Sequence, residues 1–174
     1  MKRAGTLALC TAGFLLAAGH GFAQTTDALV ATKTDWSVFD PPESPKQCFG
    51  VSSPKETVNT RDGKPVSVKR SDILLFVTFH PGQANGETSF TGGYPFAGGS
   101  TVTLNVDGTK FEMVVDGEWA WPANTDDDAK VLAALQKGQS AILTGHSSKG
   151  TQTQDTFSLR GFTAAMTEAA SRCK

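Results

Sequence analysis

The residues best suited to catalysis lie together at 145–149, which reads Gly-His-Ser-Ser-Lys. Ser147 beside His146 would suit nucleophilic acyl transfer, in which a histidine activates a serine hydroxyl. The nucleophile motif Gly-x-Ser-x-Gly, however, needs glycine where Lys149 stands, and it needs a turn from a strand into a helix. The surrounding pattern instead predicts a hairpin turn between two strands. We therefore expect no catalytic residues and no enzyme.

No metal or cofactor site is predicted. His80 and His146 have no cysteine, histidine or carboxylate at metal-ligand spacing. The glycine-rich loop 92–99 is not followed by the Gly-Lys-Ser/Thr of a phosphate loop, so we interpret it as a crossing between sheets. Asp126–Asp128 are contiguous, unlike the alternating ligands of a calcium loop, and helix capping explains them.

Four aromatic residues form the one candidate binding patch: Tyr94 and Phe96 of the glycine-rich loop, with Trp119 and Trp121 of a later strand. Aromatic side chains offer large contact areas to small ligands and to proteins alike. A cleft lined by these four residues would make the chain a small-ligand carrier. An exposed patch would instead suit a partner protein.

The two tryptophans share one face of their strand because Glu118 and Ala120 alternate with them. A two-residue turn at Asp116-Gly117 would pair Val114 with Trp119. The tryptophans would then lie away from the core. Either the helix that follows, through Val131 and Leu135, covers them, or they stay exposed. The closeness of that helix favours the covered arrangement.

The N-terminus follows a secretory pattern. Lys2 and Arg3 precede an apolar run from Leu7 to Ala18, and Gly21-Phe22-Ala23 is typical of a cleavage site. This predicts a signal peptide over 1–23 and a periplasmic or secreted protein. The apolar run is shorter than the roughly 20 residues that a membrane span needs. No membrane span is expected elsewhere.

Export changes the charge and the cysteine count. Without Lys2 and Arg3, 14 of the 16 basic residues remain against 17 acidic ones, a net charge of −3. This balance does not favour binding to nucleic acid or to an anionic membrane. Cys48 and Cys173 become the remaining cysteines in an oxidising compartment, which favours one disulfide between them. Two buried free thiols are the alternative.

Local patterns predict short strands and two helices. Residues 24–33 are small and polar and are expected to be a flexible tether before a single domain, 34–174. Asp107-Gly108 joins two alternating runs and predicts a hairpin in which Val106 faces Thr109. A helix is expected near 125–137, with Thr125 as N-cap and Asp128 completing a capping box, and a second at the C-terminus.

The predicted fold class is therefore mainly β. About nine short strands separated by frequent turn signals favour an antiparallel β-sandwich of the immunoglobulin-like kind, with the two short helices added. A barrel is the alternative. The apolar face of the C-terminal helix must pack on this sheet, and the predicted disulfide would tie its last turn to the first strands.

Several segments together resemble the invasion-associated locus B family of exported bacterial proteins. They are Lys55–Gly63, Thr91–Ser100, Asp116–Pro122 and Thr151–Ala165. The resemblance implies a β-sandwich and a periplasmic or secreted location in a Gram-negative bacterium. For the pathogen members it implies a part in entry into host cells. It implies no enzyme, no cofactor and no catalytic residues.

These observations predict an exported, non-catalytic, monomeric protein that contacts an unknown partner protein in the envelope or the host. Such contacts would serve host-cell invasion or envelope maintenance. The alternative is a periplasmic small-ligand-binding protein that uses the aromatic cleft.

Overall fold

The computed structural model describes residues 28–83 and 85–174, and the predicted signal peptide lies outside them. The strands are β1 (Leu29–Lys33), β2 (Trp36–Phe39), β3 (Cys48–Ser52), β4 (Glu56–Arg61), β5 (Lys64–Pro65), β6 (Leu74–Phe79), β7 (Glu87–Thr91), β8 (Thr101–Val106), β9 (Thr109–Asp116), β10 (Trp119–Pro122), β11 (Ser140–His146) and β12 (Gln152–Ser158). The helices are α1 (Thr125–Lys137) and α2 (Phe162–Arg172). The predicted mainly-β class with two helices is confirmed.

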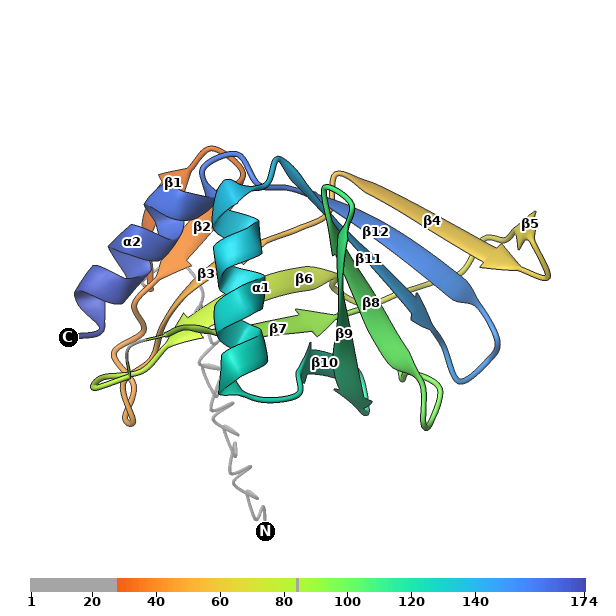
Figure 1. The fold of residues 1–174 in the computed structure, drawn as a ribbon, viewed down its shortest axis with the longest axis horizontal. Coiled ribbons are helices and arrows are strands. Elements are labelled where there is room, and N and C mark those ends of the chain that lie inside the picture. Colours follow the sequence, from red (N-terminus) through yellow and green to blue (C-terminus); the bar gives the residue numbers. More distant parts are fainter. Residues whose placement is uncertain (1–27, 84) are drawn as a thin grey trace, which may run out of the picture.

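All twelve strands belong to one antiparallel sheet, in the order β1-β2-β3-β6-β7-β10-β9-β8-β11-β12-β4-β5. The sheet curves, and its two halves enclose a common core (Figure 1). Phe90 of β7 meets Phe157 of β12 at 6.1 Å between ring centroids, although these strands are not neighbours. One sheet thus supplies both facing layers, whereas an immunoglobulin-like domain uses two sheets. Accumulated strand twist makes so wide a sheet curl.

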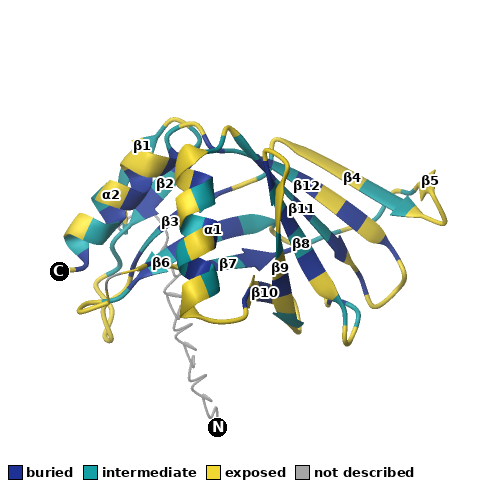
Figure 2. Cartoon of the chain, viewed as in Figure 1, coloured by how far each residue is buried: buried dark blue, intermediate teal, exposed yellow. Residues whose placement is uncertain are grey.

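The core lies between the two halves of the sheet and beneath the helices. Its largest fully buried side chains include Trp36, Phe90, Phe157 and Phe162. Figure 2 shows buried residues alternating with less buried ones along the central strands, while β4 and β5 are largely exposed. Within 28–83 and 85–174, neither helix has the length and apolar character needed to cross a membrane.

The β8–β9 hairpin has the predicted register. Asp107 and Gly108 form the turn with φ values of 45° and 99°, as a type I′ turn requires. Val106 pairs with Thr109, and the pairing continues along the hairpin without a shift. The side carrying Leu104 faces the core. A local turn signal therefore determined the register of two strands.

Helix α1 lies where it was predicted, but its cap differs. The N-cap is Asn124 instead of Thr125: its Oδ1 accepts a hydrogen bond from Asp127 N at 3.0 Å, and its Nδ2 donates to Asp127 Oδ2 at 2.9 Å. Asp128 is buried and accepts from Thr88 N of β7 at 2.8 Å. Asparagine ranks among the best N-caps, and the contact with β7 takes Asp128 away from the capping role.

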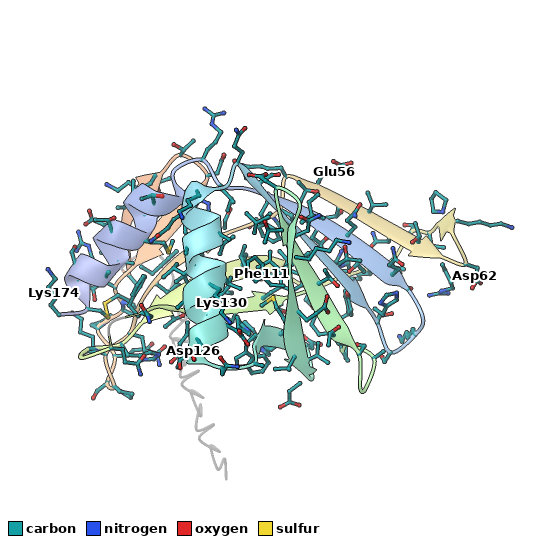
Figure 3. The ribbon with its side chains drawn as sticks, viewed as in Figure 1. Glu56, Asp62, Phe111, Asp126, Lys130 and Lys174 are labelled. Carbon is teal, nitrogen blue, oxygen red and sulfur yellow. A yellow bond between two sulfur atoms is a disulfide. The ribbon has the colours of Figure 1, made fainter. Side chains whose placement is uncertain are left out.

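The charged side of α1 faces solvent. Figure 3 shows Asp126 and Lys130 along the outer surface of the helix, and both residues are exposed. The opposite side carries Val131 and Leu135, which are buried in the core. The helix therefore closes the core between the two halves of the sheet.

Helix α2 packs across β2 and β3. The ring of Phe162 meets Trp36 edge-on, with centroids 4.9 Å apart. Met166 lies against Gly50 of β3, where any Cβ atom would overlap the terminal methyl group of Met166. Glycine at this point lets the helix approach the sheet closely.

The last turn of α2 is tied to the sheet by a disulfide. Cys173 follows the helix and is bonded to Cys48 at the start of β3, with 5.6 Å between their Cα atoms. The predicted Cys48–Cys173 disulfide is confirmed. The bond joins positions 125 residues apart, so it closes nearly the whole domain.

The flexible tether predicted over 24–33 is wrong for its second half. Leu29–Lys33 forms β1, which pairs with β2, and Val30 and Ala31 pack against the core. Residues 24–27 lie outside the described part of the chain. The turn that makes this hairpin holds Thr34 at a φ of 56°, which is rare for a β-branched residue. Because threonine occupies this position instead of glycine or asparagine, the sequence contains no local indication of the turn.

Replacing Gly161 by alanine is expected to destabilise the fold mainly through overlap. Gly161 has a φ of 87°, and a Cβ atom there would overlap the carbonyl oxygen of Lys33. Gly150 has a φ of 77° but open space around it, so G150A adds only left-handed strain, about 1–2 kcal/mol. We expect G161A to lose about 1–3 kcal/mol more than G150A in urea unfolding. Equal losses would contradict this close approach.

Candidate functional site

The four predicted patch residues lie in two places. Tyr94 and Phe96 contact each other, with centroids 5.0 Å apart, and Phe96 is buried with 6% of its surface exposed. Trp119 and Trp121 are 42% and 39% exposed on the outer face of β10. The predicted single cleft lined by all four is therefore wrong. Phe96 is instead part of the core, and its backbone forms an isolated antiparallel β-bridge with Ser147.

The prediction that α1 covers the tryptophans is also wrong. The β9–β10 turn uses Gly117 and Glu118, so Trp119 pairs with Asp116, two residues from the predicted partner. A slip of two residues keeps every side chain on its face. The tryptophans thus point outward as predicted, but α1 packs on the opposite, core-facing side of β10, where Ala120 is buried.

Trp119 continues a line of aromatic side chains on the outer face of the sheet. Phe39 of β2 stacks on Phe49 of β3 at 5.2 Å, Phe49 meets Phe76 of β6 at 5.8 Å, and Phe76 meets Trp119 at 5.8 Å between centroids. We call these four residues, with the neighbouring Trp121, the aromatic row. No sequence pattern predicts it, because its members come from four separate strands.

Polar side chains surround the tryptophan end of the aromatic row. A shallow hollow beside Trp119 and Trp121 is also lined by Gln47, His80 and Glu87. His80 Nε2 lies 3.7 Å from Glu87 Oε2. An apolar centre with a polar rim is the usual anatomy of a protein-binding surface.

The tryptophans should be accessible to solvent and contribute little stability. We expect acrylamide to quench most of the fluorescence of the parent protein but little of that of W119F/W121F, which keeps only the buried Trp36. We also expect W121A to cost about 1 kcal/mol, below the roughly 3–5 kcal/mol of a buried tryptophan. Protected fluorescence in the parent protein, or a large loss of stability, would restore the covered arrangement.

A second polar cluster is buried near Tyr94. Arg70 forms a bidentate pair with Asp155, at 2.8 Å from Nη1 to Oδ1 and 2.6 Å from Nη2 to Oδ2. The guanidinium carbon lies 5.0 Å from the centroid of the Tyr94 ring, and Arg70 Nε donates to the carbonyl of Gly92 at 2.7 Å. The Arg70 side chain is therefore held on three sides.

Burial changes the proton affinity of two members of this cluster. It raises the pKa of Asp155, and the hydrogen bonds and charge of Arg70 oppose that rise. Burial also raises the pKa of the Tyr94 phenol, whose hydroxyl is hydrogen-bonded to Thr153. Asp155 and Tyr94 were not predicted as a pair, because they are 61 positions apart and nothing local links them.

Ser147 shapes a turn, as the hairpin interpretation predicted. Its Oγ accepts hydrogen bonds from Lys149 N at 3.3 Å and Thr151 N at 3.1 Å. The segment joins β11 to β12, which pair as an antiparallel hairpin. His146 is exposed while Ser147 is buried, since neighbouring residues of a strand face opposite ways. The described residues contain no group of three or more potential metal ligands.

The fold and its surfaces define a mainly-β protein whose candidate sites lie on a single curled sheet. Residues 56–170 match the family model described as Invasion associated locus B (IalB) protein, so the chain belongs to this family. The resemblance inferred from the sequence is thereby confirmed. A similar solved structure is that of invasion associated protein b from Bartonella henselae, with a TM-score of 0.52 and 19% identity over 81% of this chain and 95% of that chain. No curated protein matches the chain.

Proposed function

We propose that this chain is an exported, non-catalytic, monomeric member of its family that works by binding a partner protein. The partner would lie in the bacterial envelope or on a host cell, and the aromatic row would be the contact surface. The signal-peptide pattern of residues 1–23 and the Cys48–Cys173 disulfide support a periplasmic or secreted location. The family description supports a role associated with invasion.

The observation that carries this proposal is the exposure of the aromatic row. Trp119 and Trp121 are among the large apolar side chains that remain exposed in the described part of the chain. They adjoin the half-buried Phe76, Phe49 and Phe39 in one strip. Contiguous apolar strips of this kind mark interaction surfaces, and tryptophans contribute most to binding at such surfaces.

The test is a comparison of W119A/W121A with two other proteins, the parent and V58S. Val58 of β4 is 39% exposed, and four strands separate β4 from β10 in the sheet, so V58S removes an exposed apolar side chain away from the aromatic row. Each protein is immobilised and exposed to periplasmic extract, culture fluid and host-cell surface extract. We expect the parent and V58S to retain equal amounts of the same partner. W119A/W121A should retain at least about tenfold less, as for a pair of central contact residues.

Two further measurements separate this result from misfolding and from intracellular retention. All three proteins should keep their circular dichroism spectra, and cell fractionation should find the parent outside the cytoplasm with Gln24 as its first residue. Equal capture by W119A/W121A and parent would remove the aromatic row as the contact surface. Accumulation of the uncleaved chain in the cytoplasm would contradict export.

A further inference from the structure

A basic pocket lies where the end of β4, the loop before β6, the glycine-rich loop and the β11–β12 turn meet. Its volume is about 410 Å³, within the range of small-ligand sites. Four basic residues line it: Arg61, Lys69, Arg70 and Lys149. Glu118 is the acidic residue in the lining. Figure 3 shows Asp62, the neighbour of Arg61, at the far end of the β4–β5 hairpin, opposite Lys174.

Most of this positive charge is not compensated within the protein. Asp155 neutralises Arg70, but no ion pair of the described residues involves Arg61, Lys69 or Lys149. Three cations therefore face one carboxylate in a chain whose net charge is −1. Charges of one sign around a concave surface attract counter-ions of the other sign.

The pocket is also preorganised. Arg61 Nη2 donates to the buried Thr151 Oγ1 at 2.7 Å, which uses one of its donors and orients the guanidinium. Arg70, held by Asp155 and Tyr94, supplies a rigid wall. Guanidinium groups bind carboxylate and phosphate oxygens through paired N–H donors, and an oriented side chain loses less entropy on binding.

We propose that this pocket binds a small organic anion through its carboxylate or phosphate group. Arg61 holds the anionic oxygens, Lys69 and Lys149 add charge at the mouth, and the hydroxyl groups of the lining bind the polar remainder. This ligand differs from the one expected for an aromatic cleft, and the proposal does not depend on the aromatic row.

Calorimetric titration of the mature protein at low ionic strength tests the site. The probes are inorganic phosphate, succinate as a carboxylate, and erythritol as a neutral polyol. We expect at least one anion to bind and erythritol not to bind. Binding of phosphate alone would assign a phosphate-bearing ligand, binding of succinate alone a carboxylate, and binding of both a general oxyanion site. Absence of binding by both anions would overturn the proposal.

Charge-neutralising variants locate the binding. We expect R61Q and K149Q each to weaken anion binding about tenfold, because each removes a charged donor. K110Q removes an equal charge from the exposed β9 strand, outside the pocket lining, and should bind like the parent. An unchanged affinity in R61Q or K149Q, or an equal loss in K110Q, would overturn the site.

Discussion

Loss of the Cys48–Cys173 disulfide should lower the free energy of unfolding by about 5 kcal/mol. The bond closes a loop of 125 residues, and the chain-entropy model assigns a loop of about this length a stabilisation of this size. Both cysteines are buried, so the bond also holds the end of α2 against β3. Urea unfolding of the protein with and without reductant measures the difference.

The variant C48S/C173S provides the control. It should unfold like the reduced parent protein and should not respond to reductant. Hydrogen exchange should show α2 opening before the β8–β9 hairpin, because the helix loses its covalent tie. Two alkylatable thiols in protein purified from the periplasm would contradict the bond. Equal stability with and without reductant would show that the tie contributes nothing.

Replacing Arg70 by methionine should destabilise the fold by about 3–5 kcal/mol at neutral pH. Asp155 is fully buried, and its two oxygens accept from Arg70. Removing Arg70 leaves that carboxylate without its partner in the core, which is far more costly than removing both members of the pair. Thermal and urea unfolding of R70M and the parent measure the loss.

The pH dependence distinguishes a buried charge from lost packing. In R70M the pKa of Asp155 in the folded state lies well above its ordinary value, because burial is no longer opposed by Arg70. The folded state then holds a proton that the unfolded chain has lost. The deficit is therefore full above the folded-state pKa and shrinks as the pH falls toward the unfolded-state pKa.

The double variant R70M/D155N removes the charge altogether. It should be more stable than R70M at neutral pH. Its difference in stability from the parent should vary much less than that of R70M between pH 7 and pH 4. The lower limit is close to the unfolded-state pKa of aspartate, about 3.9. A deficit in R70M that is the same at every pH would show that Arg70 acts through packing alone. The pair would then not be the electrostatic support of the basic pocket.

The two candidate surfaces make different demands on the fold. The aromatic row needs only that neighbouring strands expose side chains of one kind on one face. The basic pocket needs side chains from four separate segments to be held at fixed positions, and the pair of Arg70 with Asp155 joins one of these segments, the loop before β6, to β12. Disruption of this pair should therefore weaken anion binding while leaving the exposure of Trp119 and Trp121 unchanged.

The sequence by itself was enough wherever the signal was local. Asp107-Gly108 determined the register of β8 and β9, because a two-residue turn leaves one pairing of the flanking residues. The apolar spacing of α1 located that helix, although the choice of Asn124 over Thr125 as its cap depended on the contact of Asp128 with β7. The even cysteine count that the predicted removal of the signal peptide leaves was enough to predict the disulfide.

Only the tertiary structure decided which faces are covered and which residues meet. The alternation around Trp119 predicted its face correctly, but whether α1 covers that face depends on where the chain turns after β10. The aromatic row and the basic pocket depend on strand order, which places β6 beside β3 and β12 beside β4. Such pairings join residues up to about a hundred positions apart. Their stability comes from burial against residues that are distant in the sequence, so a short sequence segment cannot predict them.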